Sequence, residues 1–489
     1  MAEVMHPNGL FKPIPFIALA VLIGPGSAPA AFAGDASDPF SVQALTSSSQ
    51  TGGYARDQSA PPCAQGDAAK TLLSLWNVVD RALCDNPQTR SAWANARLSA
   101  ARVGVARSAY LPTLSASGSV SRNRANGGTR AGDTSSSGTT AYNAENASLA
   151  AGYLLYDFGA RDAILDNAVQ TLAVSNFTQD ATLQKVFLSA LQAYYQLFGA
   201  RAAVAAAAEA ERASLESLKA ASARYDAGAA TPADKLQAQT AYSQAQLNRI
   251  QAEGNARNAE GALANVMGLD ANRSLQYVAP VLKAPEDKFE QNLAQLISDA
   301  RRRRPDLAAA EAQLKAAQAN VQAVRAANMP TVSLSAGAGY SGSSLSDSLH
   351  SQSLGISLSV PIFTGYNSSY QIRAAQAQAE SQAAQRDSVR LQVALDVWQA
   401  YQNLSTGIQA VRSSGDLVAS ATESARVALG RYKAGAGTII DLVAAQSALA
   451  SARQQNIQAR YSLYIYQATL AQALGRIDWE LVDESDGMR

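Results

Sequence analysis

The sequence predicts a mainly helical protein with a transmembrane β-barrel portion, built from two tandem copies of one unit that each hold a β-hairpin and long antiparallel helices. Three observations predict this fold class. RYDAGAATPADKLQAQ at 224–239 recurs nearly unchanged as RYKAGAGTIIDLVAAQ at 431–446. Four segments alternate apolar with small polar residues, which is the period of β-strands. Two stretches, 160–225 and 366–432, keep helical periodicity without a proline.

The N-terminus has the pattern of an export signal. Lys12 precedes an apolar run at 15–23, and AFA at 31–33 has the A-x-A form of a cleavage site. We therefore expect a signal peptide at 1–33 and an N-terminal periplasmic segment at 34–86. No cysteine follows the cleavage site directly, which argues against a lipid anchor.

The two cysteines, Cys63 and Cys84, both fall in the mature chain. In an oxidising compartment, two cysteines this close in sequence favour a disulfide between them. A pair of unpaired thiols is the alternative.

Charge and composition argue against several classes of function. The chain has 40 Lys and Arg against 39 Asp and Glu, so no overall field attracts nucleic acid. Its two histidines are His6, in the signal, and His350, in a predicted hairpin loop. Two such histidines are too few for most histidine-based metal sites or catalytic triads. We therefore expect that the protein is not an enzyme and that it binds no cofactor and no metal. The four arginines at 301–304 suit a helix C-terminus better than a nucleic-acid patch.

The duplication sets the domain boundaries. Gly268 and Gly475 share the 207-residue offset of the repeated motif, whereas Pro112 and Pro330 are 218 residues apart. The first copy therefore carries an insertion after Pro112. We expect copy one at 87–268, an equatorial inter-repeat segment at 269–304, copy two at 305–475 and a C-terminal tail at 476–489.

Each copy is predicted to hold one hairpin, at about 113–156 in copy one and 331–362 in copy two. The first strand reads LSASGSVS from Leu114, with apolar or small residues alternating with serines. Strands of about 9–10 residues with one apolar face are typical of membrane-spanning β-strands. The Gly-, Ser-, Thr- and Asn-rich residues 122–146 predict a surface loop, and a shorter loop is expected from Tyr340.

Helices fill the rest of each copy. At 1.5 Å per residue, the two proline-free stretches make rods of about 100 Å. Shorter helices are expected at 88–110, 233–266, 306–328 and 440–474. Two of them, end to end, nearly match one rod. The predicted architecture is a set of antiparallel rods below a four-stranded patch of sheet.

Each repeated stretch ends one rod and begins the next, so the tips are expected at 224–234 and 431–441. Gly228 and Gly435 stand where a helix C-terminus favours a left-handed residue. A threonine then serves as N-cap with an aspartate three residues later, a capping box in carboxylate form. The two pairs are Thr231 with Asp234 and Thr438 with Asp441.

Four strands cannot close a barrel, and the unpaired backbone groups of a sheet edge find no water inside a membrane. The chain must therefore associate with further copies. Three copies supply twelve strands, and we infer a homotrimer; a dimer with eight strands stays open on strand count alone.

The chain resembles the TolC family of outer-membrane export ducts over nearly the whole mature sequence, in both copies. The most specific shared element is RYKAGAGTIIDLVAAQ at 431–446. The resemblance implies a trimeric barrel in the outer membrane of a Gram-negative bacterium, continuous with a periplasmic α-helical tunnel. It also implies partners: a periplasmic adaptor protein, an inner-membrane pump of the RND or ABC type, and outer-membrane lipid.

The resemblance also implies roles for the tips. It places adaptor contacts at Arg224, Tyr225, Gly228, Arg431, Tyr432 and Gly435. An acid at the position of Asp441, together with Asp234, narrows the periplasmic entrance as a ring in such ducts. Capping alone is the competing interpretation of Asp441. Ala444 and Gly437 stand where the best-known member carries a second acid and a base, so we expect a less tightly held entrance.

Two functions compete at this point. One is the exit duct of a tripartite efflux or type I secretion system, which passes substrates from an inner-membrane pump across the periplasm and outer membrane. The other is a structural, rod-like periplasmic protein without channel activity. The four alternating strands favour the duct. The pump selects the substrate, so this sequence does not name it.

Overall fold

The computed structural model describes residues 38–46, 72–131, 134–273, 275–282, 292–344 and 346–476. Two compact units divide the chain, Met1–Ser41 and Val42–Arg489. In the first unit, the described residues form a turn in which the Ser41 N–H donates to the Asp38 carbonyl at 3.0 Å. The predicted signal peptide, Cys63 and the tail beyond Arg476 lie outside the described residues. All helices and strands below belong to the second unit.

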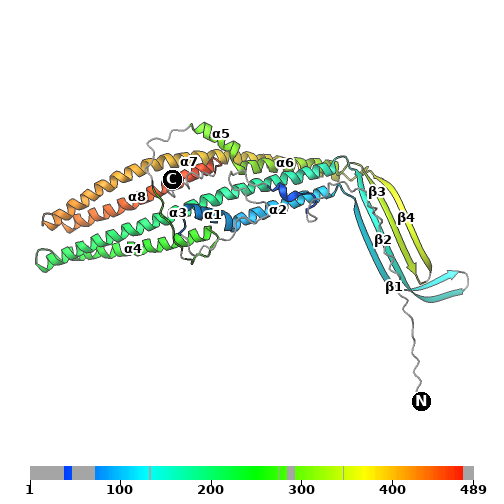
Figure 1. Ribbon diagram of the computed structural model, residues 1–489, viewed down its shortest axis with the longest axis horizontal. Coiled ribbons are helices and arrows are strands. Elements are labelled where there is room, and N and C mark those ends of the chain that lie inside the picture. Colours follow the sequence, from blue (N-terminus) through cyan, green and yellow to red (C-terminus); the bar gives the residue numbers. More distant parts are fainter. Residues whose placement is uncertain are drawn as a thin grey trace, which may run out of the picture. The chain divides into compact units, whose positions relative to one another are not determined.

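Copy one and copy two contain the same series of elements. Copy one consists of α1 (Leu75–Asp85), α2 (Pro87–Ser108), β1 (Thr113–Ala131), β2 (Thr134–Tyr156), α3 (Ala160–Asp226) and α4 (Pro232–Val266). Copy two consists of α5 (Leu293–Arg303), α6 (Pro305–Ala326), β3 (Thr331–Ser343), β4 (Ser346–Ser359), α7 (Asn367–Lys433) and α8 (Ile439–Ala473). A short 3-10 helix, η1 (Val42–Leu45), precedes them. The predicted mainly helical fold with one hairpin per copy is confirmed (Figure 1).

The helices α3 and α7 are the two predicted rods, and each runs for 67 residues. At 1.5 Å per residue, such a helix is about 100 Å long. Neither begins with a side-chain cap; a left-handed residue, Gly159 or Tyr366, turns the chain from strand into helix. Among the described residues, no helix has both the length and the hydropathy needed to cross a bilayer.

The duplication extends further upstream than the prolines that predict it. The helices α1 and α5 each have 11 residues and begin 218 positions apart, at Leu75 and Leu293. Sequence reasoning misses α1, although Ser74 caps its N-terminus. Val78 and Val79 follow Leu75 on one face, and all three side chains are fully buried. Each copy therefore begins with a short helix ahead of its prolines.

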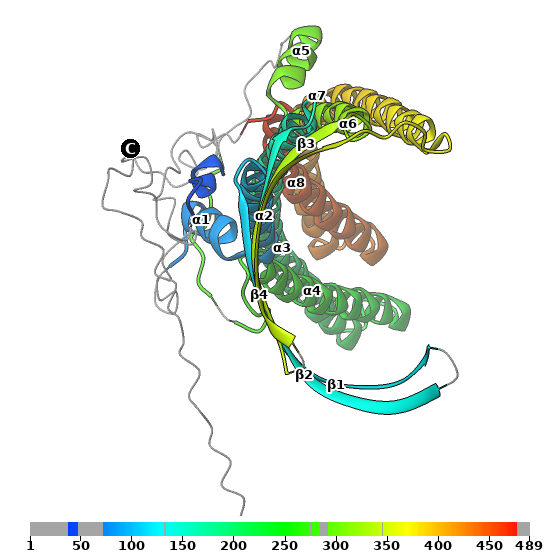
Figure 2. The same cartoon turned by 90° about the vertical axis from the view of Figure 1, so that its right-hand side faces the viewer.

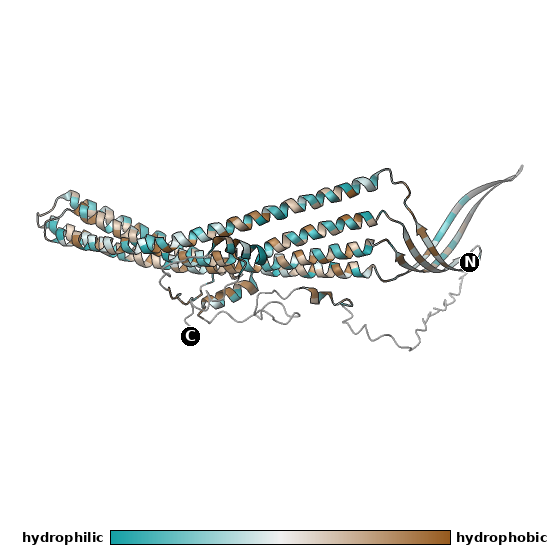
Figure 3. Ribbon diagram, turned by 90° about the horizontal axis from the view of Figure 1, so that it is seen from above, coloured by the Kyte–Doolittle hydropathy of each residue, from teal (hydrophilic) through white to brown (hydrophobic). Residues whose placement is uncertain are grey.

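The helices form a curved wall (Figure 2). Away from the sheet, the hairpin α3–α4 lies beside the hairpin α7–α8, with α3 against α8. Nearer the sheet, α3 packs between α2 and α6, and α6 packs against α7. Polar and apolar residues alternate along these helices (Figure 3), and alanine is frequent among the buried ones. Within one chain the wall has two open edges, formed by α2 and α4 on one side and by α7 on the other.

The largest apolar cluster lies where α1 and α4 both meet α3. Leu191, Tyr194 and Leu197 of α3 are at its centre and are at most 1% exposed. The Tyr194 hydroxyl donates to the Val278 carbonyl at 2.5 Å, and the Val278 N–H donates to the Leu73 carbonyl at 2.9 Å. The segment after α4 is thereby held against the long helix of copy one.

A glycine with positive φ follows α4 and another follows α8, and each packs on the bend between the first two helices of its copy. Gly268 has a φ of +73° and Gly475 a φ of +74°. A Cβ on Gly268 would lie 2.5 Å from the Asp85 carbonyl oxygen, and one on Gly475 would lie 2.9 Å from the Arg303 carbonyl carbon. Both positions therefore require glycine, for conformation and for space.

The four strands form one antiparallel sheet in the order β1-β2-β3-β4. Leu149 of β2 pairs with Ala116 of β1 on one side and with Ala338 of β3 on the other. On the edge strand β4, Leu354 and Ile356 are 78% and 71% exposed. This alternation presents an apolar face of the kind that the sequence predicts for lipid contact.

The predicted loop at 122–146 is wrong. Residues 122–131 pair with residues 134–143 and continue β1 and β2 as a two-stranded ribbon. The four strands run for 19, 23, 13 and 14 residues, longer than the predicted strands. Polarity does not break the ladder, because its hydrogen bonds come from the backbone and a ribbon outside the main sheet can be polar on both faces.

The shorter loop predicted from Tyr340 in copy two is also wrong. β3 continues to Ser343 and β4 starts at Ser346, so only two residues connect the strands. His350, predicted in that loop, pairs with Tyr340 inside the sheet, and the two ring centres are 5.3 Å apart. The serines and glycines here are typical of a loop, but they continue the β3–β4 pairing, which shifts register between Ser341 and Ser343.

Candidate functional site at the helix tips

Both copies end their long helix in the same hydrogen-bonded turn. Gly228 has a φ of +75°, and its N–H donates to the Tyr225 carbonyl at 2.9 Å. The Ala229 N–H donates to the Arg224 carbonyl at 2.8 Å, which completes a Schellman motif. In copy two the equivalent bonds are 3.1 and 2.9 Å long, and Gly435 has a φ of +78°. The left-handed glycine predicted at each tip is present.

A capping box starts the helix that leaves each tip. In copy one, the Asp234 N–H donates to the Thr231 hydroxyl at 3.2 Å, and the Thr231 N–H donates to the Asp234 carboxylate at 2.9 Å. In copy two, the same two bonds join Thr438 and Asp441 at 3.2 and 3.3 Å. Pro232 occupies the first turn of α4. All four capping side chains therefore have a structural role at the tips.

Both tip carboxylates are held in the ionised form. The Thr231 N–H, and then its hydroxyl, lower the pKa of Asp234 by hydrogen bonding. The Thr438 hydroxyl, and then its N–H, lower the pKa of Asp441 in the same way. Asp441 is exposed, whereas Asp234 is half-buried. The tip of copy two therefore presents a negative charge to solvent.

One arginine joins the two tips. Arg224 donates from Nη1 to the Tyr432 carbonyl at 2.6 Å, and its guanidinium lies 4.9 Å from the centre of the Tyr432 ring. Nη2 of Arg224 also donates to the Ala229 carbonyl of its own turn at 3.4 Å. Arg431, its counterpart in copy two, donates to the Ala436 carbonyl at the same distance and is exposed.

The two tip tyrosines lie in opposite environments. Tyr432 is 3% exposed and belongs to an apolar cluster with Ile439 and Leu442. Burial raises the pKa of Tyr432, and its hydroxyl forms no hydrogen bond with the described residues. Tyr225 is 39% exposed, and the Lys235 ammonium lies 5.3 Å from its ring centre. The chain itself therefore buries the tip tyrosine of copy two and leaves that of copy one exposed.

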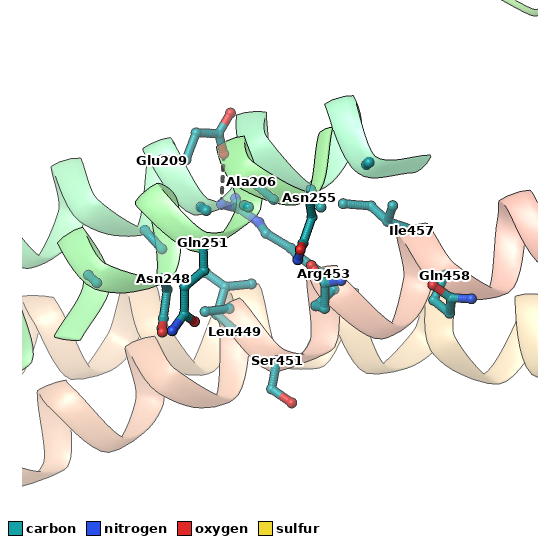
Figure 4. A pocket seen from close by; sticks show the side chains of 18 of the residues that line it. Ala206, Glu209, Asn248, Gln251, Asn255, Leu449, Ser451, Arg453, Ile457 and Gln458 are labelled. Carbon is teal, nitrogen blue, oxygen red and sulfur yellow. Dashed lines mark hydrogen bonds and ion pairs between the residues drawn. The ribbon is translucent and has the colours of Figure 1, made fainter. Parts of the chain in front are cut away.

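A groove of about 720 Å³ opens between α3, α4 and α8 (Figure 4). Its walls combine alanines with polar side chains such as Asn248 and Gln251 of α4 and Gln458 of α8. Arg453 reaches Glu209 on the opposite wall at 2.7 Å. The alanines in this lining allow neighbouring helices to approach closely.

Cys84 lies in α1, is buried, and takes part in a disulfide. Its predicted partner, Cys63, lies outside the described residues, so the pairing stays a prediction. Because α1 packs on α3, a bond at Cys84 ties its partner segment to the core of copy one.

Comparison with known proteins relates this geometry to one family. Residues 78–269 and 296–476 match the family model described as outer membrane efflux protein. The two matched segments cover both copies of the duplicated unit. The chain belongs to the outer membrane efflux protein family.

Individual members of the outer membrane efflux protein family align along most of the chain. Protein CyaE of Bordetella pertussis is 33% identical over 448 residues, which cover 88% of this chain and 92% of CyaE. Outer membrane efflux protein BepC of Brucella suis is 26% identical over 411 residues, which cover 83% and 86% of the two chains. The crystal structure of the Campylobacter jejuni CmeC outer membrane channel shares the fold, with a TM-score of 0.72 at 20% identity over 82% of this chain and 85% of CmeC.

This outer membrane efflux protein is therefore an efflux or secretion duct of the Gram-negative outer membrane, with a barrel portion and a periplasmic helical tunnel. The predicted resemblance to the TolC family is confirmed, and so are the predicted function and location. The family consists of channels, which favours the duct over the structural rod.

The structure brings some predicted tip residues of the efflux protein together and leaves others apart. Arg224 and Tyr432 touch, whereas their counterparts Arg431 and Tyr225 are both exposed. Sequence reasoning misses the pairs that join the copies above the tips, among them Arg453 with Glu209. No local pattern identifies such partners, because they lie more than 200 residues apart in the sequence.

Proposed function

We propose that three copies of this chain assemble into the exit duct of a tripartite export system. The observation that carries the proposal is that the four-stranded sheet has two unpaired edges, β1 and β4. In a membrane, the backbone groups of an edge strand have no water to bond. Three four-stranded sheets give twelve strands, within the range of closed outer-membrane barrels. The same closure covers the open edges of the helical wall.

In this assembly the duct has no catalytic activity of its own. An inner-membrane pump of the RND or ABC type supplies the energy and selects the cargo, and a periplasmic adaptor joins the pump to the tips. The groove between α3, α4 and α8 supports a passive role, since alanines and amides make up more than half of its lining residues.

The entrance of the duct lies at the tips, with Asp441 and Asp234 as its charged constriction. Asp441 is exposed, and hydrogen bonds from Thr438 lower its pKa. Around a three-fold axis, three such carboxylates approach one another at the narrow end of the tunnel. Like charges held close together favour a bound cation.

Channel recordings in planar bilayers test the entrance. Asp441→Ala removes a capping carboxylate, a loss of about 1 kcal/mol that long packed helices tolerate. We expect normal assembly and a current that is less sensitive to block by divalent or trivalent cations on the periplasmic side. Glu380→Ala, an exposed acid on α7 away from the tip, is the matched control. Block at the same cation concentration in wild type and Asp441→Ala leaves Asp441 as a helix cap and nothing more.

The adaptor docks on the exposed side of the tips. Tyr432 is buried in its own cluster, so of the predicted docking residues it supports the tip from inside. The remaining docking residues are exposed or half-buried and belong to two turns of fixed shape; they are Arg224, Tyr225, Gly228, Arg431 and Gly435.

The double variant Gly228→Val, Gly435→Val tests docking. No atom lies within 4 Å of a Cβ on Gly228, and the nearest to one on Gly435 is the end of the Arg224 side chain at 3.9 Å. Valine therefore disturbs the left-handed turns and leaves the core intact. We expect export to stop while the barrel and oligomer persist. Gly415→Val, in an exposed part of α7, controls for valine itself. Full export by the double variant shows that the tips are mere turns.

A further inference from the structure

Three pairs of polar or aromatic side chains are among the contacts between copy one and copy two at the tips and along α3. In each pair, a residue of α3 meets a residue of the α7–α8 hairpin. The pairs are Arg224 with Tyr432 (4.9 Å from guanidinium to ring centre), Ser217 with Gln446 (2.9 Å from hydroxyl to amide nitrogen) and Glu209 with Arg453 (2.7 Å). These contacts hold the two hairpins side by side within the chain.

Each of these six positions has a counterpart 207 residues away. In the first two pairs the counterparts are the same residue types, and in the third they are an acid and an amide. They are Arg431 with Tyr225, Ser424 with Gln239, and Asp416 with Gln246. All six side chains are exposed, and none of these three pairs makes a hydrogen bond, ion pair or ring contact among the described residues.

We propose that α7 of one copy of this chain packs against the α3–α4 hairpin of a second copy through these three pairs. Arg431, Ser424 and Asp416 belong to the first chain, and Tyr225, Gln239 and Gln246 belong to its neighbour. Arg431 lies over the Tyr225 ring, Ser424 forms a hydrogen bond with Gln239, and Asp416 contacts Gln246. The inference rests on the proposed assembly and deepens it by naming the residues at which two chains meet. Such a contact joins different surfaces of identical chains, so it repeats around a ring until the ring closes.

The helix lengths support a second copy as the occupant of these edges. The long helices α3 and α7 have 67 residues each, and α4 and α8 have 35 each. Equal lengths and the constant 207-residue offset place the counterpart pairs at the same register as the internal pairs. The open edges of the wall carry them on opposite sides, α7 on one and α4 on the other (Figure 2).

The chemistry at Tyr225 is also complementary to a second copy. The internal contact shows an arginine guanidinium over a tyrosine ring at 4.9 Å. Lys235 covers one face of the Tyr225 ring at 5.3 Å, which leaves the other face for Arg431 of the neighbour. A guanidinium is attracted to an aromatic face.

The proposed contact between two chains is more polar than the contact between copy one and copy two within a chain. Inside the chain, Leu442 belongs to the same apolar cluster as Tyr432 and is fully buried. Its counterpart near Tyr225 is Lys235. The internal ion pair at Arg453 is likewise replaced by an amide. The seam between chains therefore depends on hydrogen bonds and cation–ring contacts instead of an apolar cluster.

Cysteine pairs on two differently tagged chains test the seam. Ser424→Cys in one chain and Gln239→Cys in the other are co-expressed, and isolated outer membranes are treated with a short bis-maleimide. We expect a cross-linked species that carries both tags. The matched control is the internal pair, Ser217→Cys with Gln446→Cys. On separate chains this pair should give no product with both tags, and on one chain it should give an internal link. The unsubstituted chain, treated alike, sets the background from the native cysteines.

The outcomes separate the seam from the assembly. A product with both tags from Ser424 and Gln239, with none from the internal pair, supports the seam. An oligomer by mass without that product, in membranes where the internal pair does link on one chain, overturns the seam and leaves the duct intact. A monomer by mass overturns both. If the internal pair on separate chains also gives a product that carries both tags, the internal contact on which the seam is based is contradicted.

Discussion

Each copy bends between its first two helices, α1 and α2 in copy one and α5 and α6 in copy two. The two bends have the same backbone conformation but are stabilised by different side chains. Asn86 and Arg304 occupy them, 218 positions apart, with φ and ψ of −63° and 128° in one and −70° and 121° in the other. Asn86 caps α2 with its side chain and donates to the Val266 carbonyl at 2.9 Å. Arg304 instead pairs with Asp306 at 2.6 Å and Asp396 at 2.7 Å.

This difference shows that the two copies share backbone geometry more strictly than the chemistry that supports it. Asn86 is neutral, so the bend of copy one depends on hydrogen bonds. The Arg304 side chain is 8% exposed, and a charge at that depth needs the carboxylates beside it. Burial opposes the charge, but the two aspartates outweigh it and raise the pKa of Arg304. The bend of copy two therefore depends on ion pairs, whereas the bend of copy one depends on neutral hydrogen bonds.

The largest loss of stability is expected at the feature that the two bends share, which is a glycine packed on each of them. Gly268→Ala places a Cβ 2.5 Å from the Asp85 carbonyl oxygen at a φ of +73°. Left-handed strain and overpacking together predict a loss of about 2–5 kcal/mol in the free energy of unfolding. Gly475→Ala, with its nearest contact at 2.9 Å, should lose somewhat less. Urea unfolding followed by circular dichroism measures both.

Gly228→Ala is the matched control for that prediction. Gly228 has a similar φ of +75°, and nothing lies within 4 Å of an added Cβ. It isolates the left-handed strain, about 1–2 kcal/mol. Equal losses for Gly228→Ala and Gly268→Ala would show that close packing on the bend contributes nothing.

The next largest loss of stability is expected at the side chains that differ between the bends, Arg304 and Asn86. Arg304→Met leaves Asp306 and Asp396 without their cation. These carboxylates are 38% and 29% exposed, so water compensates them in part. We expect the free energy of unfolding to fall by about 2 kcal/mol, less than for a fully buried pair. Asn86→Ala removes neutral hydrogen bonds and should cost about 1 kcal/mol in the same urea titration.

Arg302→Met controls for the loss of an arginine as such. Arg302 also pairs with an aspartate, Asp299 at 2.5 Å, but its side chain is 74% exposed. Exposed pairs of this kind contribute about 0–1 kcal/mol. If Arg304→Met is as stable as Arg302→Met, the electrostatic dependence assigned to copy two is refuted.

The smallest effect depends on pH and compares the two rods. Asp180 of α3 and Asp387 of α7 are counterparts at the 207-residue offset. Asp180 is half-buried, and burial raises its pKa to about 6. The Asp387 side chain is 57% exposed and lies 2.8 Å from Arg386. The same residue type is therefore half-buried in copy one and ion-paired at the surface in copy two.

The sign of the pH effect follows from the direction of the shift. Because the pKa of Asp180 is higher in the folded state than in the unfolded chain, ionising Asp180 lowers stability as the pH rises from about 4 to above about 6. Asp180→Asn removes that cost, so we expect no change at about pH 4 and a gain of about 1 kcal/mol at about pH 7.5. Asp387→Asn should show no such gain. Parallel pH profiles for wild type and Asp180→Asn would contradict the prediction.

The helix ends follow from the sequence closely, because particular residue types mark them chemically. The rod expected at 160–225 runs over Ala160–Asp226, and Gly228 turns the chain after it. Thr438 marks the start of α8 through its hydroxyl and the carboxylate of Asp441. These signals act within a few residues, so one sequence is enough to recognise them.

The hairpins and the contacts between copies do not follow from the sequence in the same way. In residues 122–146, a loop-like composition covers a regular strand pairing, and only backbone partners across the ribbon reveal it. Arg224 meets Tyr432 across 208 positions, and nothing near either residue names the other. The duplication shows which residues are counterparts, but the fold decides which of them are buried.

Closure of the sheet is the central claim, because the barrel, the tunnel and the seam between chains all depend on it. The mass of the intact protein purified from outer membranes in mild detergent tests it most directly. Since β1 and β4 are the edges of a four-stranded sheet, we predict a single species with three times the mass of the mature chain. A species with the mass of one chain, or of two, would contradict the account.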